Sequence, residues 1–360
     1  MGTTAQHFED LLSRVPADLR ERLTTGIKVM TLPGNVPPWT ETELQVSAGQ
    51  QFTLLAAGEI TWSRHRNLSA RPRHHLWARV GRAGSVLNGT QDTYTFESPD
   101  TGALHLCIYH GQWADKVGNL ETPVSAYEKL GGEIDVLVVV WRGEAEAGLA
   151  ELRDAVGGDP LIDAELARIS AAVERPNGWH YLWQTGYSDA FTEVEIGDRR
   201  FIRVRADNDQ GILQRPASIT LSPETRLSWS WRVTELPATE PEDTAPTHDY
   251  VSIAVEFDNG RDLTYMWSCA LPPEKAFHCP IKHWTARETH LVVRSGTDGL
   301  GDWHTETRDV FDDYRRHMGP PPSAIVAVWL IVVSTFQHGT AEAEFADIVL
   351  SDEFTRQTVL

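Results

Sequence analysis

The stretch "LSWSWRV", residues 227–233, decides the fold of this chain. Successive side chains of an extended strand point to opposite faces of a sheet, so residues two apart share a face. Read in this way, the stretch separates completely into an apolar and a polar set, which a helix would mix. It therefore predicts a half-buried β-strand with Leu227, Trp229 and Trp231 on the buried face and Ser228, Ser230 and Arg232 on the other.

The same alternation recurs along the second half of the chain. In "YVSIAVEF", residues 250–257, Val251 and Ile253 belong to the inward set, whereas Tyr250, Ser252 and Glu256 belong to the opposite one. Further short runs of this type are separated by Gly, Pro, Asn and Asp, which indicates an antiparallel sandwich over residues 176–360. The polar face is open to two interpretations, a ligand-binding surface or a solvent-exposed side of the sheet.

The first half has the same character. "LQVSAGQQFTLLAAGEITW", residues 44–62, contains two strands around a turn, and "GGEIDVLVVVW", residues 131–141, is another strand. Stretches rich in Ala, Glu and Leu at both ends of this half have helical spacing. We therefore predict a mainly β protein with two antiparallel, jelly-roll-like β-sandwich domains joined by a short helical linker. The expected boundaries are a helical segment at 1–26, a first sandwich at 27–142, the linker at 143–175 and a second sandwich at 176–360.

Charge and hydropathy exclude several classes of partner. The net charge of −19 repels a phosphate backbone, so no nucleic-acid partner is expected. The longest apolar run, "IVAVWLIVV" at residues 325–333, is too short to cross a bilayer as a helix, so no membrane partner is expected either. The N-terminus has no basic-then-apolar leader and the three cysteines form no CxxC pair, which favours a cytoplasmic protein with reduced thiols. A homodimer remains compatible with the sequence.

Two histidines are candidates for acid–base chemistry. His304 lies among acidic residues in "RSGTDGLGDWHTETRDVFDDYRR", residues 294–316, and His248 precedes Asp249. A histidine beside a carboxylate can exchange a proton near neutral pH, and Glu256 could serve the same purpose. We therefore name His304, His248, Glu256 and Asp249 as catalytic candidates. The alternative is structural, because the glycines of the same stretch form a turn and Asp309 caps a short helix.

Binding candidates come from the polar faces of the same strands. They are Trp303, Arg232, Ser252 and Tyr250, which combine an aromatic ring with hydrogen-bonding groups. The remaining histidines have no metal-ligand spacing, so the sequence indicates no zinc site. Nucleotide-binding and serine-nucleophile motifs are missing as well, and no cofactor is expected.

The first sandwich resembles the galactose-binding PA-I-like bacterial lectins over residues 27–141. The resemblance rests on "WTETELQVSAGQQFTLLAAGEITW" and "YTFESPDTGALHLCIYHG". It implies sugar binding through a calcium ion, with the binding positions at Trp62 and at His110, where the expected carboxylate is missing. Calcium needs several oxygen ligands, which Asp115 and Asn119 of the following loop could supply next to Trp113. Calcium is thus the one ion that the resemblance allows.

The second sandwich resembles a bacterial family of unknown function, the one numbered 3047. The matching segments include "LSWSWRV", "HDYVSIAVEF", "LTYMWS" and "AEFADIVL". This resemblance implies a β-sandwich and no particular reaction.

Three functions are consistent with these observations. The first is recognition of a carbohydrate or polyol-like small molecule, favoured by the lectin-like half and by the 13 tryptophans, which suit sugar stacking as well as sandwich cores. The alternative is a cofactor-independent lyase, cyclase or hydrolase with histidine acid–base catalysis in a groove between the domains. An interaction protein without either activity is the third.

Overall fold

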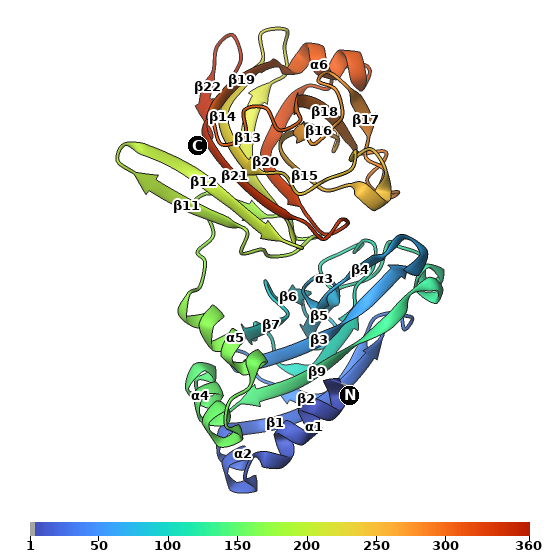
Figure 1. Cartoon of the computed structure of the whole chain (residues 1–360), viewed down its shortest axis with the longest axis vertical. Helices are drawn as coiled ribbons and strands as arrows, with labels where there is room; N and C mark the ends of the chain where they lie inside the picture. Colours follow the sequence, from blue (N-terminus) through green and yellow to red (C-terminus); the bar gives the residue numbers. More distant parts are fainter. Residues whose placement is uncertain (1–3) are drawn as a thin grey trace. The chain divides into compact units, whose positions relative to one another are not determined.

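The computed structural model describes residues 4–360 and is mainly β (Figure 1). The chain divides into two compact units, Met1–Ala172 and Val173–Leu360, and each has hydrophobic cores of its own. Both units are β-sandwiches, so the predicted fold class is confirmed. Over residues 4–360, no helix combines the length and the apolar character that a membrane span requires.

Two sheets form the sandwich of the first unit. Between them lies a core that includes Leu54, Ala56, Val136 and Leu106. The five-stranded sheet has the order β1-β9-β3-β4, with β7 paired to β3, and the four-stranded sheet has the order β2-β8-β5-β6. The strands are β1 (Thr24–Pro33), β2 (Thr40–Val46), β3 (Gln51–Ser63), β4 (Leu68–Ala70), β5 (Leu76–Val80), β6 (Leu87–Asn88), β7 (Thr93–Glu97), β8 (Gly102–Ile108) and β9 (Gly131–Trp141).

Helices cover the other face of the five-stranded sheet. Alternate residues of the strands, such as Leu55 and Val139, point away from the sandwich core and pack with Phe8 and Leu149 of the helices. The predicted linker thus folds as part of the first unit, and Asp159 caps its second helix by accepting from the backbone N–H of Leu161 at 3.0 Å. The helices are α1 (Thr4–Arg14), α2 (Ala17–Leu23), α4 (Ala145–Val156) and α5 (Pro160–Ser170); short ones at α3 (Pro72–His75), η1 (Arg64–Arg66) and η2 (Val124–Lys129) join strands.

The second unit contains a seven-stranded and a six-stranded sheet. The orders are β10-β13-β20-β15-β16-β18-β17 and β11-β12-β21-β14-β19, with β22 paired to β21. The strands are β10 (His180–Tyr181), β11 (Phe191–Ile196), β12 (Arg199–Asp207), β13 (Gln210–Thr220), β14 (Arg226–Glu235), β15 (Tyr250–Phe257), β16 (Asp262–Ser268), β17 (Ala276–His278), β18 (Glu288–Ser295), β19 (His304–Asp309), β20 (Ala324–Val333), β21 (Thr340–Ser351) and β22 (Arg356–Thr358).

The core between these two sheets contains the apolar set of the opening stretch. Trp229 and Trp231 of β14 are fully buried there against Tyr265 and Trp267 of β16. The predicted orientation of this strand is therefore correct. The helix expected near residue 310 is also present as α6 (Val310–His317), with Asp309 accepting from the backbone N–H of Asp312 at 3.0 Å. A short turn, η3 (Ala245–Thr247), leads into β15.

One strand pair departs from the antiparallel expectation. β16 and β18 run parallel, with Asp262 beside Glu288 and Thr264 beside His290. The chain reaches this arrangement because β17 forms the edge of the sheet first and β18 then returns between β16 and β17. Residues of β16, β18 and β17 that are far apart in the sequence thereby become neighbours in the sheet.

Candidate functional site

The predicted site residues fall on separate surfaces of the two units. Those on or next to β15 belong to the outer face of the seven-stranded sheet, the face that points away from the sandwich core. Arg232 belongs to the outer face of the six-stranded sheet, where Trp303 contacts it. The residues named from the lectin resemblance lie in the first unit. The sets are thus His248, Tyr250, Ser252 and Glu256; Arg232 and Trp303; and Trp62, His110, Trp113, Asp115 and Asn119.

The outer face of the seven-stranded sheet is buried rather than open to solvent. Tyr250 is 4% exposed and Ser252 is fully buried. A second hydrophobic cluster covers this face, in which Met266 and Trp329 of the sheet pack with loop residues such as Leu271. The alternation predicted for β15 is therefore present, but loops enclose its polar side.

Four chemically active side chains meet on this buried face. Glu288 and His290 are two residues apart on β18 and so share a face, and the backbone N–H of Cys279 bonds the carbonyl of Glu288 at 3.0 Å. His248 joins them from the segment before β15. One ligand-type atom from each of the four residues lies within 4.8 Å of the others, and all four side chains are buried. Only His248 of this group was named from the sequence.

Two short separations define the geometry of this cluster. The Sγ atom of Cys279 is 3.4 Å from Nε2 of His248, and Nε2 of His290 is 3.3 Å from Oε1 of Glu288. The Nδ1–H group of His248 donates to the backbone carbonyl of Glu242 at 2.7 Å. Because that bond fixes the ring, Nε2 of His248 is directed at the cluster with its lone pair available.

Hydrogen bonding within the cluster is incomplete. Among the described residues, neither ring nitrogen of His290 has a hydrogen-bond partner of good geometry. Its ring is instead stacked on Phe277, with 4.9 Å between the ring centroids. Tyr250 donates its hydroxyl to Oε1 of Glu288 at 3.1 Å. The cluster thus combines a fully buried imidazole with a carboxylate that is held in place by a tyrosine.

Burial sets the protonation states of these groups. Burial, together with the nearby ring of His290, lowers the pKa of His248 to about 3, so this imidazole is neutral at pH 7. Burial also raises the pKa of the Cys279 thiol far above its usual range. Burial on its own would also raise the pKa of Glu288. Interactions with His290 and His248 outweigh this effect and hold the pKa of Glu288 below its usual value. The cluster therefore contains the carboxylate of Glu288, the thiol of Cys279 and the neutral imidazole of His248.

A row of carboxylates extends from this cluster across the sheet. Glu256, Asp262 and Glu288 are direct neighbours on β15, β16 and β18. Arg287 is the cation beside them, 3.2 Å from Glu256 and 3.6 Å from Asp262. Burial and the charge of Glu288 raise the pKa of Asp262 well above its usual value. A proton on Asp262 therefore reduces the negative charge of the three neighbouring carboxyl groups. Glu256 thus lies at the opposite end of this row from Glu288, on the same face of the sheet as His248.

The outer face of the six-stranded sheet carries a different, more exposed set of groups. The guanidinium of Arg199 lies 3.6 Å from the ring centre of Trp303, and that of Arg232 lies 5.4 Å from it. Arg232 donates to Glu344 at 2.8 Å, and Arg203 approaches the same carboxylate at 3.0 Å. The structure thus brings together Trp303 and Arg232, two of the predicted binding residues, and adds three charged neighbours.

The remaining catalytic candidates have local partners. Nε2 of His304 is 2.9 Å from the carbonyl of Gly299, and its ring packs on Trp267, which faces the sandwich core. His304 and His248 therefore lie on opposite sides of the seven-stranded sheet. Asp249 is fully buried and accepts from the backbone N–H groups of Phe336 and Gln337 at 2.9 and 2.6 Å. These bonds give Asp249 a role in holding the loop after β20.

The first-unit candidates are engaged within their own loops. Trp62 donates its indole N–H to Nε2 of His75 at 3.0 Å, and His110 lies next to Trp62 with 6.4 Å between the ring centroids. Trp113 is 1% exposed and stacks on Tyr109. Asp115 accepts from both the backbone and the side-chain N–H groups of Asn119, an arrangement that closes a turn.

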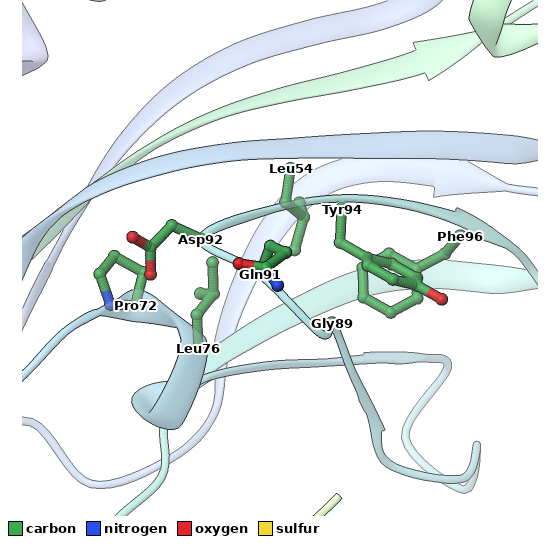
Figure 2. A pocket seen from close by; sticks show the side chains of 8 residues that line it. All are labelled: Leu54, Pro72, Leu76, Gly89, Gln91, Asp92, Tyr94 and Phe96. Carbon is green, nitrogen blue, oxygen red and sulfur yellow. The ribbon is translucent and has the colours of Figure 1, made fainter. Parts of the chain in front are cut away.

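A small hollow lies elsewhere in the first unit. Figure 2 shows it between β3, α3 and β7, lined largely by apolar side chains such as Leu54, Leu76 and Phe96. Its carboxylate, Asp92, is bound by Arg71 at 2.8 Å and by the backbone N–H of Arg73 at 2.9 Å. The hollow is lined by a different set of residues from those predicted to bind sugar.

Comparisons with known proteins bear on the second unit most directly. Residues 178–349 match a family described as "Protein of unknown function (DUF3047)", which confirms the resemblance proposed for this part of the chain. No curated protein matches the chain.

Several solved structures are similar to parts of the chain. The N-terminal domain of EclA, a PllA-like lectin, is 19% identical with a TM-score of 0.26, and the match covers 33% of this chain and 98% of that one. The xyloglucanase domain of NopAA, a type three effector from Sinorhizobium fredii, is 11% identical with a TM-score of 0.30, covering 50% and 95%. A family 30 carbohydrate-binding module from Clostridium thermocellum is 13% identical with a TM-score of 0.28, covering 51% and 96%.

Proposed function

We propose that the second unit binds a carbohydrate or another polyol on the outer face of its six-stranded sheet. The observation that carries this proposal is the group formed by Trp303, Arg199, Arg232 and Glu344. It joins a half-buried aromatic ring to two guanidinium groups that are partly exposed, with the carboxylate of Glu344 buried beneath them, whereas the outer face of the seven-stranded sheet is enclosed by loops.

The chemistry of this group suits a ligand with many hydroxyl groups. A sugar ring has an apolar face that can stack on an indole, while its hydroxyls need donors and acceptors around the edge. Arginine supplies several N–H donors in a fixed plane. The buried carboxylate of Glu344 holds Arg232 at 2.8 Å, so the guanidinium of Arg232 would meet the ligand with little loss of side-chain freedom.

Hydroxyl groups extend the same face along β14 and β19. Ser228 lies 2.9 Å from Thr307 and Ser230 lies 3.0 Å from Thr305, measured between their hydroxyl oxygens. Thr305 and Thr307 are exposed. A ligand longer than one sugar could continue over these pairs, because neighbouring residues of one face are spaced by two positions along each strand.

Binding of immobilised oligosaccharides to the full chain tests this proposal, followed by calorimetry with the best ligand. Trp303→Ala is expected to weaken binding by at least about tenfold, equal to about 1.4 kcal/mol, because the stacking surface is removed. Phe354→Ala is the matched control, since Phe354 is an aromatic residue that is 88% exposed elsewhere in the unit. If no oligosaccharide binds, or if both variants bind like the original chain, the proposal is wrong.

The alternative, a lyase, cyclase or hydrolase that uses His248 and His304 together, has less support. Their imidazoles face opposite sides of one sheet, so a single small substrate would not reach both.

A further inference from the structure

We propose that His248, Cys279, Glu288 and His290 bind one zinc ion on the enclosed face of the second unit. This site is independent of the sugar-binding proposal, because the two lie on the outer faces of different sheets.

The geometry of the cluster suits a tetrahedral ion. With zinc–nitrogen and zinc–sulfur bonds of about 2.0 to 2.3 Å, two ligand atoms of a tetrahedral site lie roughly 3.3 to 3.8 Å apart. The separations of 3.4 Å between Cys279 and His248 and 3.3 Å between Glu288 and His290 match two edges of such a tetrahedron. Every other separation is within 4.8 Å, which shifts of about 1 Å in buried side chains would close.

The donor atoms select the kind of ion. Two imidazole nitrogens, one sulfur and one carboxylate oxygen form a set typical of Zn²⁺ and of its substitute Co²⁺. Calcium and magnesium need oxygen ligands almost exclusively, so they are disfavoured here. The bond from His248 to the carbonyl of Glu242 and that from Tyr250 to Glu288 orient two of the ligands, as the partners of metal ligands do.

The environment also leaves a place for a cation. Among the described residues, Nδ1 of the fully buried His290 has no hydrogen-bond partner and Nε2 lies 3.3 Å from Oε1 of Glu288 without good hydrogen-bond geometry, whereas buried polar groups are normally paired. The carboxylates of Glu288, Asp262 and Glu256 are neighbours, and Arg287 is the guanidinium that lies beside two of them. A divalent cation bound to Glu288 would give the imidazole of His290 a partner. It would also reduce the negative charge of the three neighbouring carboxylates.

Zinc binding releases to solvent the protons that its ligands carry. The ion binds each of the two imidazoles through a deprotonated ring nitrogen and binds Glu288 as the carboxylate. The Cys279 thiol must give up its proton to solvent as the zinc–sulfur bond forms. The thiolate and the carboxylate then carry two negative charges against the two positive charges of the ion. Four protein ligands in a buried setting make this a closed, structural zinc site rather than an open catalytic one.

Cobalt spectroscopy on a single-thiol form of the full chain tests the site. Cys107→Ala/Cys269→Ala removes the other two cysteines and leaves Cys279 as the only sulfur that can produce a thiolate-to-cobalt charge-transfer band. We expect one Co²⁺ per chain, that band in the near ultraviolet, intense visible bands of tetrahedral Co²⁺ and displacement of the cobalt by one equivalent of Zn²⁺.

Two further variants locate the other ligands. His290→Ala is expected to weaken zinc binding at least about 100-fold in competition with a chromophoric chelator. His283→Ala, which changes a histidine outside the cluster, should bind like the original chain. A single-thiol chain that binds no cobalt, or binds it without the charge-transfer band, overturns the proposal, and this decision does not depend on whether the His290 variant folds.

Discussion

The Sγ atom of Cys279 lies 3.4 Å from Nε2 of His248, although 31 positions separate the two residues in the sequence. Their meeting depends on the seven-stranded sheet, which places β17 at its edge and β18 between β17 and β16. Loops then cover the outer face of this sheet and enclose the two side chains with Glu288 and His290. The fold of the second unit is therefore what creates this cluster.

Replacement of Glu242 by glutamine is expected to destabilise the second unit. Glu242 is 1% exposed and accepts from the hydroxyl of Ser268 and from the backbone N–H of Cys269, each at 2.6 Å. An amide would present an N–H group to one of these donors, so the free energy of unfolding should fall by about 1–3 kcal/mol. Urea unfolding followed by circular dichroism measures the change.

The control is Glu240→Gln, at an exposed site nearby, which should leave the unfolding midpoint in place. Equal midpoints for the two variants would contradict the role of Glu242 as a buried hydrogen-bond acceptor.

Asp313 and Asp312 offer a matched comparison of a buried and an exposed carboxylate. Asp313 is 3% exposed, accepts from Arg308 at 2.8 and 2.9 Å and receives the hydroxyl of Tyr265 at 3.2 Å. Asp313→Asn breaks a buried ion pair and should cost about 3 kcal/mol of stability. Asp312 pairs with Arg315 at the surface of α6, so Asp312→Asn should have a far smaller effect. Thermal unfolding of both variants measures the difference, and similar losses would show that burial is not what matters here.

His75 should make the stability of the first unit depend on pH. Burial lowers its pKa to about 4, and the neutral ring accepts from Trp62 at Nε2 while Nδ1 donates to the carbonyl of Tyr109 at 2.7 Å. Because this folded-state pKa lies below the unfolded value near 6.5, the stabilisation is complete above about pH 6.5 and is lost as the pH falls towards 4. The total is about 3 kcal/mol, from 1.36 kcal/mol per pKa unit.

The variant His75→Gln separates this contribution from other titrating groups. Its free energy of unfolding should fall less steeply than that of the original chain between pH 6.5 and 4. Carbon-13 NMR of labelled histidine gives the pKa of His75 directly. A titration midpoint near 6.5 for this residue would refute the prediction.

The sequence predicts those features that depend on neighbours along the chain. The alternation in residues 227–233 correctly separates the buried Trp229 and Trp231 from Arg232, because the direction of a side chain follows from strand geometry alone. The cap at Asp309 is likewise local, since the carboxylate binds a backbone N–H three residues later. Such features require no knowledge of how the sheets are arranged.

The buried cluster depends on contacts that no local pattern reveals. Alternation shows that Tyr250 and Ser252 share a face, but it does not show that loops from elsewhere enclose that face. Cys279, Glu288 and His290 were missed because their spacing to His248 is not that of a familiar metal motif. One signal was present: Glu288 and His290 are two residues apart at the start of a strand and therefore project side by side.

The order in which β17 and β18 follow one another has a consequence for assembly. These two strands form a hairpin, so Cys279, Glu288 and His290 are close in sequence and can come together before the rest of the sheet exists. His248 arrives only when β15 has paired with β16 and β16 with β18. An ion bound by the hairpin would therefore gain its fourth ligand, His248, when β15 joins the sheet. Loss of the ion would first weaken the contact between the edge strands β17 and β18 and the segment that precedes β15.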